Sequence, residues 1–222
     1  MKIRLFLLSL SAITLAVFTA LSYTVAKEKW NQFDFDTTVK LQDHISRDFD
    51  PLFSYFSLLG SAEVTIGLAL ILALLSLLRF KFLAVLGWLI IFPATLVEVF
   101  GKLVLLHPGT PVFMHRSVIK THLPSFYIQT DFSYPSGHMT RTVFLTTVFM
   151  ILIFFKVKNV FLKFLIMAIL IGFVAGMCVT RIYLGEHWLS DVVGGSLLGL
   201  AAGLFASALI MGFERKIILQ ES

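Results

Sequence analysis

The sequence has little charge and almost no cysteine. Only 14% of its 222 residues are charged, and Cys178 is its single cysteine. Because a soluble domain carries roughly 25% charged residues, this composition excludes a soluble enzyme and a disordered protein. A single cysteine excludes an intrachain disulfide, a disulfide-rich secreted module and a zinc site built from cysteines.

Hydrophobic residues are abundant, at 58% of the chain, and they gather in six long runs. A transmembrane helix needs about 20 mostly apolar residues, and each run is long enough. The runs cover residues 5–25, 58–78, 82–106, 136–155, 160–179 and 188–213. The sequence therefore predicts an all-α protein, a bundle of six transmembrane helices forming a single domain over residues 1–222.

Two segments near the N-terminus allow alternatives. Lys2 and Arg4 precede the first run, so a cleaved signal peptide competes with a retained helix, although the run is long for a signal peptide. Residues 27–56 are polar with interspersed aromatic residues and partly helical spacing of apolar positions. This pattern favours an amphipathic helix lying on the membrane surface between the first and second spans over a solvated loop.

Lysine and arginine clusters predict the orientation in the membrane. With six spans, four clusters fall on one side: residues 2–4, 79–81, 156–163 and 215–216. Cytoplasmic loops carry an excess of these residues, so this side is predicted to be cytoplasmic and to hold both termini. The protein is then expected in the cell membrane, with the opposite loops outside.

A stretch before the fourth run has the properties of an anion site. Pro135 is followed by Ser136, a favourable N-cap, and by Gly137, which lets a ligand approach the backbone. The exposed N–H groups at a helix N-terminus bind anions such as phosphate. His138 can exchange a proton there near neutral pH, and Arg141 follows one turn later. The alternative is an ordinary helix cap with a chance histidine.

A second stretch combines a nucleophile with its partner. His187 and Asp191 are four residues apart and share a face if they lie on a helix. A carboxylate on one imidazole nitrogen leaves the other nitrogen free to attack. Arg181 can supply a fork of donors to phosphate oxygens. The alternative is an interfacial salt-bridge network with belt aromatics.

These stretches, together with Lys102, resemble the type 2 phosphatidic acid phosphatase superfamily of membrane lipid phosphatases. The family pattern is a Lys, six residues and Arg-Pro; then Pro-Ser-Gly-His; then Ser-Arg, five residues, His, three residues and Asp. Residues 135–138 match fully, and Arg181, His187 and Asp191 match with Thr180 in place of Ser. Lys102 fits, but Gly109-Thr110 stands where Arg-Pro is expected.

The resemblance implies a mechanism without a metal or other cofactor. It makes His187 the nucleophile that forms a phosphohistidine, Asp191 its orienting partner and His138 the acid for the leaving oxygen. It assigns Lys102, Ser136, Gly137 and Arg181 to phosphate binding. The implied partner is a lipid phosphate within the bilayer and not a nucleic acid. Undecaprenyl diphosphate is the first candidate, and phosphatidylglycerophosphate or phosphatidic acid comes next.

The missing arginine of the first motif needs a replacement. Arg141 is the first candidate, Arg116 is the second, and His107 or His115 could add weaker donors. The competing interpretation is that Arg141 reaches the interface or pairs with an acid such as Glu98.

Two other functions compete with a lipid phosphatase. A metal-dependent hydrolase would use a set of histidines and an acid: His107, His115, His122, His138, His187 and Asp191. No tight ligand motif supports it. A transporter would place charges at broken helices within the membrane, whereas these charges lie at helix ends. The glycine series 172/176 and 195/199/203 is expected to serve close helix packing.

Overall fold

The computed structural model describes residues 2–119 and 131–218, with residues 212–218 as backbone only. Its α-helices are α1 (Lys2–Ala26), α2 (Asn31–His44), α3 (Asp50–Leu58), α4 (Ala62–Leu78), α5 (Phe82–Leu89), α6 (Ile91–Val104), α7 (Gly137–Lys156), α8 (Val160–Tyr183) and α9 (Leu189–Ile218). Two 3₁₀ turns, Arg47–Phe49 and Val112–Met114, complete the regular structure, and these described ranges contain no β-sheet.

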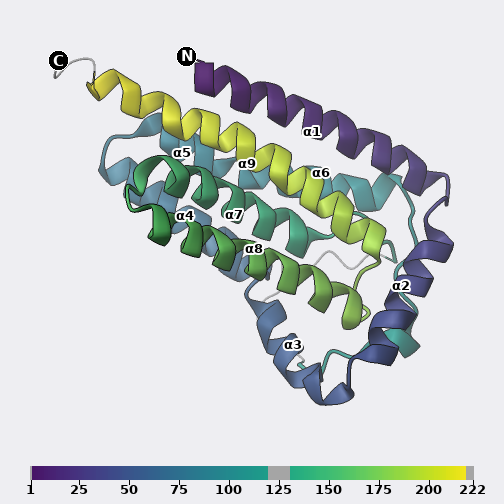
Figure 1. Ribbon diagram of the computed structural model, residues 1–222. Helices are drawn as coiled ribbons and strands as arrows, with labels where there is room; N and C mark the ends of the chain where they lie inside the picture. Colours follow the sequence, from purple (N-terminus) through teal and green to yellow (C-terminus); the bar gives the residue numbers. More distant parts are fainter. Residues whose placement is uncertain (1, 120–130, 219–222) are drawn as a thin grey trace.

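Six helical segments of the described chain are long and apolar enough to cross a membrane. They are Lys2–Ala26, Arg47–Leu78, Phe82–Val104, Gly137–Lys156, Val160–Tyr183 and Leu189–Met211. The predicted all-α bundle with six spans is therefore confirmed, and the protein is a multi-pass membrane protein. The long helices lie side by side, with both termini at one end and α2 and α3 at the other (Figure 1).

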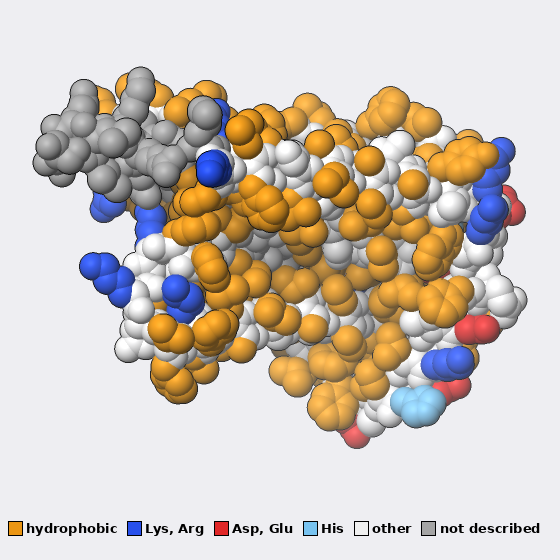
Figure 2. All heavy atoms as spheres, turned by 45° about the horizontal axis from the view of Figure 1, so that its top comes forward, with side chains coloured by type: hydrophobic (Ala, Val, Ile, Leu, Met, Phe, Trp, Pro, Cys, Tyr) orange, Lys and Arg blue, Asp and Glu red, His pale blue; other side chains and the backbone are white. Residues whose placement is uncertain are grey.

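Surface chemistry follows the same axis. In the face shown in Figure 2, hydrophobic side chains cover the middle of the molecule and charged side chains lie at its two ends. One end shows lysine and arginine, whereas the other mixes them with acidic side chains and a histidine. An apolar belt between polar ends is the surface expected of a bundle that spans a bilayer.

The third span is broken where the sequence predicted one run. α5 ends at Leu89 and α6 begins at Ile91. Pro93 has no N–H and cannot donate to the carbonyl four residues earlier, at Leu89, so the helix is interrupted there. The second half, α6, carries Glu98 and Lys102 toward the end of the bundle that holds α2.

The polar segment after the first span forms two helices, α2 and α3, instead of the one amphipathic helix predicted. Its inward face also differs from the prediction: the buried residues of α2 are polar, Asp34 and Thr38, while Phe33 and Phe35 are exposed. The helix docks onto the protein through these polar groups, as described below.

The first span is an integral part of the bundle. Ser11 Oγ donates to the Ala201 carbonyl of α9 at 2.8 Å, and Ser22 Oγ hydrogen-bonds Tyr134 Oη at 2.9 Å. These contacts favour a retained helix over a cleaved signal peptide.

Helices α7 and α9 form the centre of the bundle, and glycines let them approach closely. Gly195, Gly199 and Gly203 of α9 all face α7; a Cβ at residue 203 would lie 2.7 Å from Thr147 Cβ. The predicted packing role of this series is confirmed. It is wrong for Gly172 of α8, because no described atom lies within 4 Å of a Cβ built there.

This contrast predicts that a glycine-to-valine substitution destabilises the protein at residue 203 but not at residue 172. Gly203→Val inserts a branched side chain between α7 and α9 and should destabilise the protein by about 1–3 kcal/mol, the usual range for overpacking. Gly172→Val faces open space and serves as the matched control. Thermal unfolding in detergent should show a lower midpoint only for the variant at residue 203; equal midpoints would contradict the tight α7–α9 interface.

Candidate active site

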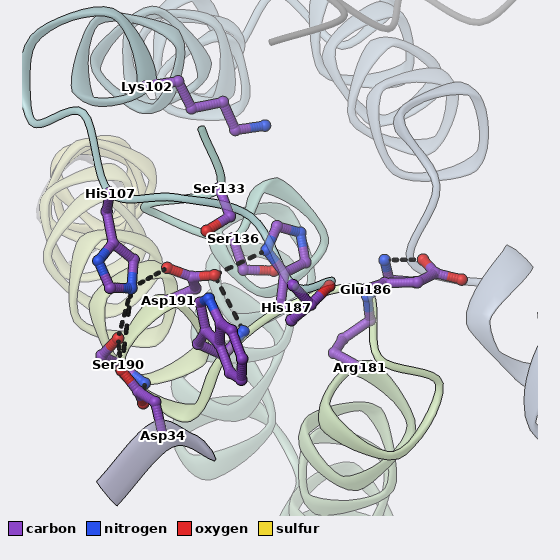
Figure 3. A network of polar contacts seen from close by, with 12 residues as sticks. Asp34, Lys102, His107, Ser133, Ser136, Arg181, Glu186, His187, Ser190 and Asp191 are labelled. Atoms are coloured by element: carbon purple, nitrogen blue, oxygen red, sulfur yellow. Dashed lines mark hydrogen bonds and ion pairs between the residues drawn. The ribbon is translucent and has the colours of Figure 1, made fainter. Parts of the chain in front are cut away.

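His187 and Asp191 meet at the start of α9. His187 Nδ1 donates to Asp191 Oδ2 at 3.3 Å, and the same oxygen accepts from the Trp188 backbone N–H at 3.0 Å (Figure 3). Asp191 is fully buried and His187 is 8% exposed. The contact occupies Nδ1, so Nε2 is the imidazole nitrogen left for chemistry.

The start of α7 lies against the same helix. The Ser136 N–H donates to the Asp191 carbonyl at 3.0 Å, which ties the two helix N-termini together. Ser136 occupies the predicted N-cap position, but its side chain makes no capping bond. Its buried Oγ has no hydrogen-bond partner among the described residues. The predicted N-cap position is therefore confirmed without a side-chain capping bond, which leaves the Ser136 O–H available as a donor.

Arg181 lies in the last turn of α8 and is 3% exposed. Its guanidinium donates to Ser57 Oγ of α3 and forms an ion pair with Glu186. Neither partner was identified from the sequence as part of a site. A carboxylate that pairs with Arg181 from the loop before α9 occupies donors that a phosphate oxygen would also use.

Glu98 of α6 binds two further cations. Its Oε1 lies 2.8 Å from Lys102 Nζ, and its Oε2 accepts from Arg141 Nη1 at 2.8 Å. Gly137 lies against this carboxylate, since a Cβ there would be 2.6 Å from Glu98 Cδ. The alternative interpretation of Arg141, a pair with Glu98, therefore describes this structure. Arg141 Nε remains without a hydrogen-bond partner within the described ranges.

A cavity of about 500 Å³ brings these groups together. Its lining includes Lys102, Gly137, His138, Arg141, Arg181 and His187, together with Glu63, Glu98, Glu186 and serines of α3. Ser136 and Asp191 are fully buried residues behind this lining. The structure thus brings the three distant stretches together at one cavity. It adds two carboxylates that the sequence did not assign, Glu63 and Glu186, beside Glu98, which was named only as a possible partner of Arg141.

Of the other candidates for replacing the missing arginine, only His115 lines the cavity among the described residues. His115 lines the cavity, but His107 lies on the far side of Asp191. Arg116 donates to the carbonyls of Gln42 and Ile45 and lies over the Tyr183 ring at 5.0 Å. Arg116 therefore serves the docking of α2.

Gly109 and Thr110, the departures from the family pattern, build a loop. The Gly109 N–H donates to the Asp131 carbonyl at 3.0 Å. Thr110 Oγ1 donates to the Gly185 carbonyl and contacts His115 Nε2 at 3.0 Å. Gly185 has a φ of +64°, and a Cβ there would overlap the Met114 carbonyl, so this turn requires glycine.

The described residues give little support to a metal-dependent hydrolase or a transporter, the two competing functions. Within the described ranges, no group of three or more His, Cys, Asp or Glu side chains is placed to hold a metal ion. His122, which belonged to the predicted metal set, lies outside the described residues. The break between α5 and α6 carries Leu89, Ile90 and Ile91 instead of the charges expected in a transporter.

Charge and burial together keep His187 neutral. Burial lowers the pKa of His187 well below its usual value of 6.5, and the positive charges of Arg181 and Lys102 lower it further. A neutral imidazole retains the lone pair that nucleophilic attack requires.

Comparison with known proteins finds a family match in the second half of the chain. Residues 108–215 match the PAP2 superfamily. This matched segment contains Gly137, His138, Arg181, His187 and Asp191, which are most of the candidate site.

A particular relative is phosphatidylglycerophosphatase B of Bacillus subtilis (strain 168). The two are 34% identical over 129 residues, which is 53% of this chain and 59% of that protein. The fold resembles the crystal structure of a transmembrane PAP2 type phosphatidylglycerolphosphate phosphatase from Bacillus subtilis, with a TM-score of 0.69 and 21% identity over 93% of this chain and 96% of that one. The structural likeness shows a shared fold.

The surroundings of His187 predict a titration. Histidine-labelled protein in detergent, followed by ¹⁵N NMR, should show His187 neutral to well below pH 6.5. Lys102→Gln removes a positive charge that disfavours the imidazolium, so the pKa of His187 should rise. Arg116→Gln, whose guanidinium serves α2, is the control and should leave it unchanged. A parent His187 that titrates at or above pH 6.5 would contradict this electrostatic environment.

Proposed function

We propose that this protein, as a single domain over residues 1–222, is a membrane phosphatase that hydrolyses a lipid phosphate or diphosphate through a phosphohistidine on His187. The observation that carries the proposal is the cavity into which His187, His138, Arg181 and Lys102 converge. It needs no cofactor, because fixed cations supply the positive charge that a metal provides in other phosphatases.

The reaction proceeds in two displacements. His187 Nε2 attacks phosphorus, the bond to the leaving oxygen breaks, and His138 gives that oxygen a proton. Water then attacks the phosphohistidine, and His138 takes a proton from this water. Phosphate leaves, and both histidines return to their starting states. Asp191 holds the Nδ1 proton of His187 throughout.

The Glu98 carboxylate supports the assignment of an anion site. Two of its contacts are Lys102 and Arg141, and it lies against Gly137 at the N-terminus of α7. A phosphoryl group presents the same kind of anionic oxygens to the same donors. Lys102, Gly137, Arg181 and the Ser136 hydroxyl would hold the phosphoryl oxygens, with Glu98 and Glu186 giving up their cations.

Three lipid substrates are consistent with this site. The similarity to phosphatidylglycerophosphatase B favours phosphatidylglycerophosphate. Undecaprenyl diphosphate, the first candidate from the sequence, fits a site at the outer face equally well. Phosphatidic acid is the third.

An assay of phosphate release from these three lipids tests the proposal. Purified protein in detergent with a chelator should release phosphate from at least one of them. His187→Ala should abolish turnover while the protein still inserts and purifies normally, because the nucleophile is lost. A variant that retained more than a few per cent of activity would contradict the role of His187, and an inactive parent would contradict the function.

Arg141 is proposed to replace the clamp missing at Gly109. It lines the cavity, and its Nη1 would exchange the Glu98 oxygen for a phosphate oxygen. Removing one preorganised donor costs on the order of 10²–10³ in rate. Arg141→Ala should lose that much turnover, and Arg141→Lys should recover part, since a point charge lacks the bidentate fork.

Arg116→Ala is the matched control for this substitution. It removes a guanidinium that binds α2 carbonyls and should leave turnover per folded molecule near that of the parent. If Arg141→Ala lowered only the unfolding temperature, Arg141 would be a partner of Glu98 alone. Loss of turnover only in the Arg116 variant would make that residue the clamp.

We also propose that the protein lies in the cell membrane with both termini cytoplasmic and the cavity at the outer face. The basic clusters at the end that holds the termini support this orientation. On a Cys178→Ala background, a cysteine at residue 118 should react with an impermeant thiol reagent in intact cells, and one at residue 158 should not. The reverse pattern would place the site at the inner leaflet.

A further inference from the structure

Asp191 uses only one of its two carboxylate oxygens toward His187. Oδ2 receives the contacts from His187 and Trp188, whereas Oδ1 is buried and has no hydrogen-bond partner among the described residues. A buried carboxylate oxygen without a donor is costly, so what faces Oδ1 matters. The imidazole of His107 faces it, with Nε2 at 3.7 Å (Figure 3).

His107 is held in this position from several sides. It is 5% exposed, and its Nε2 also lies 3.4 Å from Ser190 Oγ and 3.8 Å from Asp34 Oδ2. Its carbonyl accepts from the Ser133 N–H at 3.0 Å. The preceding residue, Leu106, has a φ of +50°, a conformation that L residues rarely adopt and that turns the chain at this point.

Asp34 anchors the other side of His107. This residue of α2 is 1% exposed and accepts from the Ser190 N–H at 2.8 Å and from Ser190 Oγ at 2.7 Å. It therefore binds the first turn of α9 next to Asp191, where a carboxylate is favoured by the helix dipole. Burial raises the pKa of Asp34 to about 6, and the hydrogen bonds from Ser190 oppose the rise.

We propose that His107, fixed by Asp34 and Ser190, is a positioning residue that orients Asp191 and through it the nucleophile His187. The inference rests on the proposed phosphatase function. Two carboxylates flank one imidazole, so an N–H on His107 Nε2 stabilises the ionised Asp191 that His187 needs. α2 thereby belongs to the catalytic apparatus without touching the substrate cavity.

Replacement of His107 separates this role from simple packing. His107→Leu should lower kcat by about 10- to 100-fold, the range found when a group that orients a metal-binding histidine is lost. KM and inhibition by inorganic phosphate should stay within about twofold, because the groups that bind phosphate are untouched. His107→Gln keeps an N–H donor and should recover part of kcat. Asp34→Asn should reproduce the loss more weakly.

Two controls accompany these variants. Thr38→Ala removes a buried hydroxyl one turn from Asp34 that donates to the Asp34 backbone carbonyl and not to its carboxylate. Because the carboxylate contacts with Ser190 and His107 are untouched, kcat should stay unchanged. Ser133→Ala tests the hydroxyl that also lies beside Asp191 and bonds the Pro108 carbonyl. Loss with Ser133→Ala but not with His107→Leu would assign the positioning role to Ser133 and overturn the proposal.

A spectroscopic measurement decides the matter independently of turnover. In ¹⁵N-histidine-labelled protein, His107→Leu should shift the ring nitrogen signals of His187, because the hydrogen bond from His187 Nδ1 depends on the charge and orientation of Asp191. Thr38→Ala should leave these signals unchanged. Unchanged His187 signals would overturn the inference even if the parent is active. If the parent hydrolyses none of the lipids, the proposed function fails, while these signals still report on the positioning of His187. If the parent is active, a kcat of the His107→Leu variant within twofold of the parent would also overturn the positioning role of His107.

Discussion

The buried carboxylate of Asp191 is the contact on which the rest of the candidate site depends. Its side chain holds His187, and its own carbonyl accepts the Ser136 N–H. One residue thus joins the start of α9, beside the proposed nucleophile His187, to the start of α7, where the proposed anion site lies. The glycines of α9 that face α7 allow the two helices to come this close. The close packing of α7 against α9 therefore also sets the relative positions of His187, Asp191 and Ser136.

Charge balance is the second feature of the cavity. Lys102, Arg141 and Arg181 line it together with Glu63, Glu98 and Glu186, so its cations and acids are matched in number among the described residues. Ion pairs that are buried need close compensation, and the acids provide it while no anion is bound. A phosphoryl group would enter by taking over contacts that Glu98 and Glu186 make. This pairing explains how three cations can be stable within a membrane bundle before a phosphoryl group is bound.

The sequence predicted the spans and the principal site residues because both leave strong local patterns. Long apolar runs mark helices, and the four-residue spacing of His187 and Asp191 predicts their contact. His187 lies in the turn before α9, however, and does not share a helix face with Asp191 as predicted. The break at Ile90 follows from Pro93, but a proline alone does not show from the sequence whether a span bends or is interrupted. Asp34 and Glu186 left no such pattern, since a single acid in a polar stretch looks like a solvated charge. Asp34 becomes important through a tertiary contact with Ser190, which only the fold brings about. Glu186 pairs with Arg181 five residues earlier, across the turn at Gly185.

The stereochemical course at phosphorus tests the two-step reaction on His187 most directly. Each in-line displacement inverts the configuration, so attack by His187 followed by attack by water gives net retention. A hydrolysable lipid thiophosphate, made chiral with oxygen isotopes and turned over in isotopically labelled water, reports this outcome. Net retention is the result expected of a phosphohistidine. Net inversion would mean that water attacks phosphorus directly and that His187 is not the nucleophile.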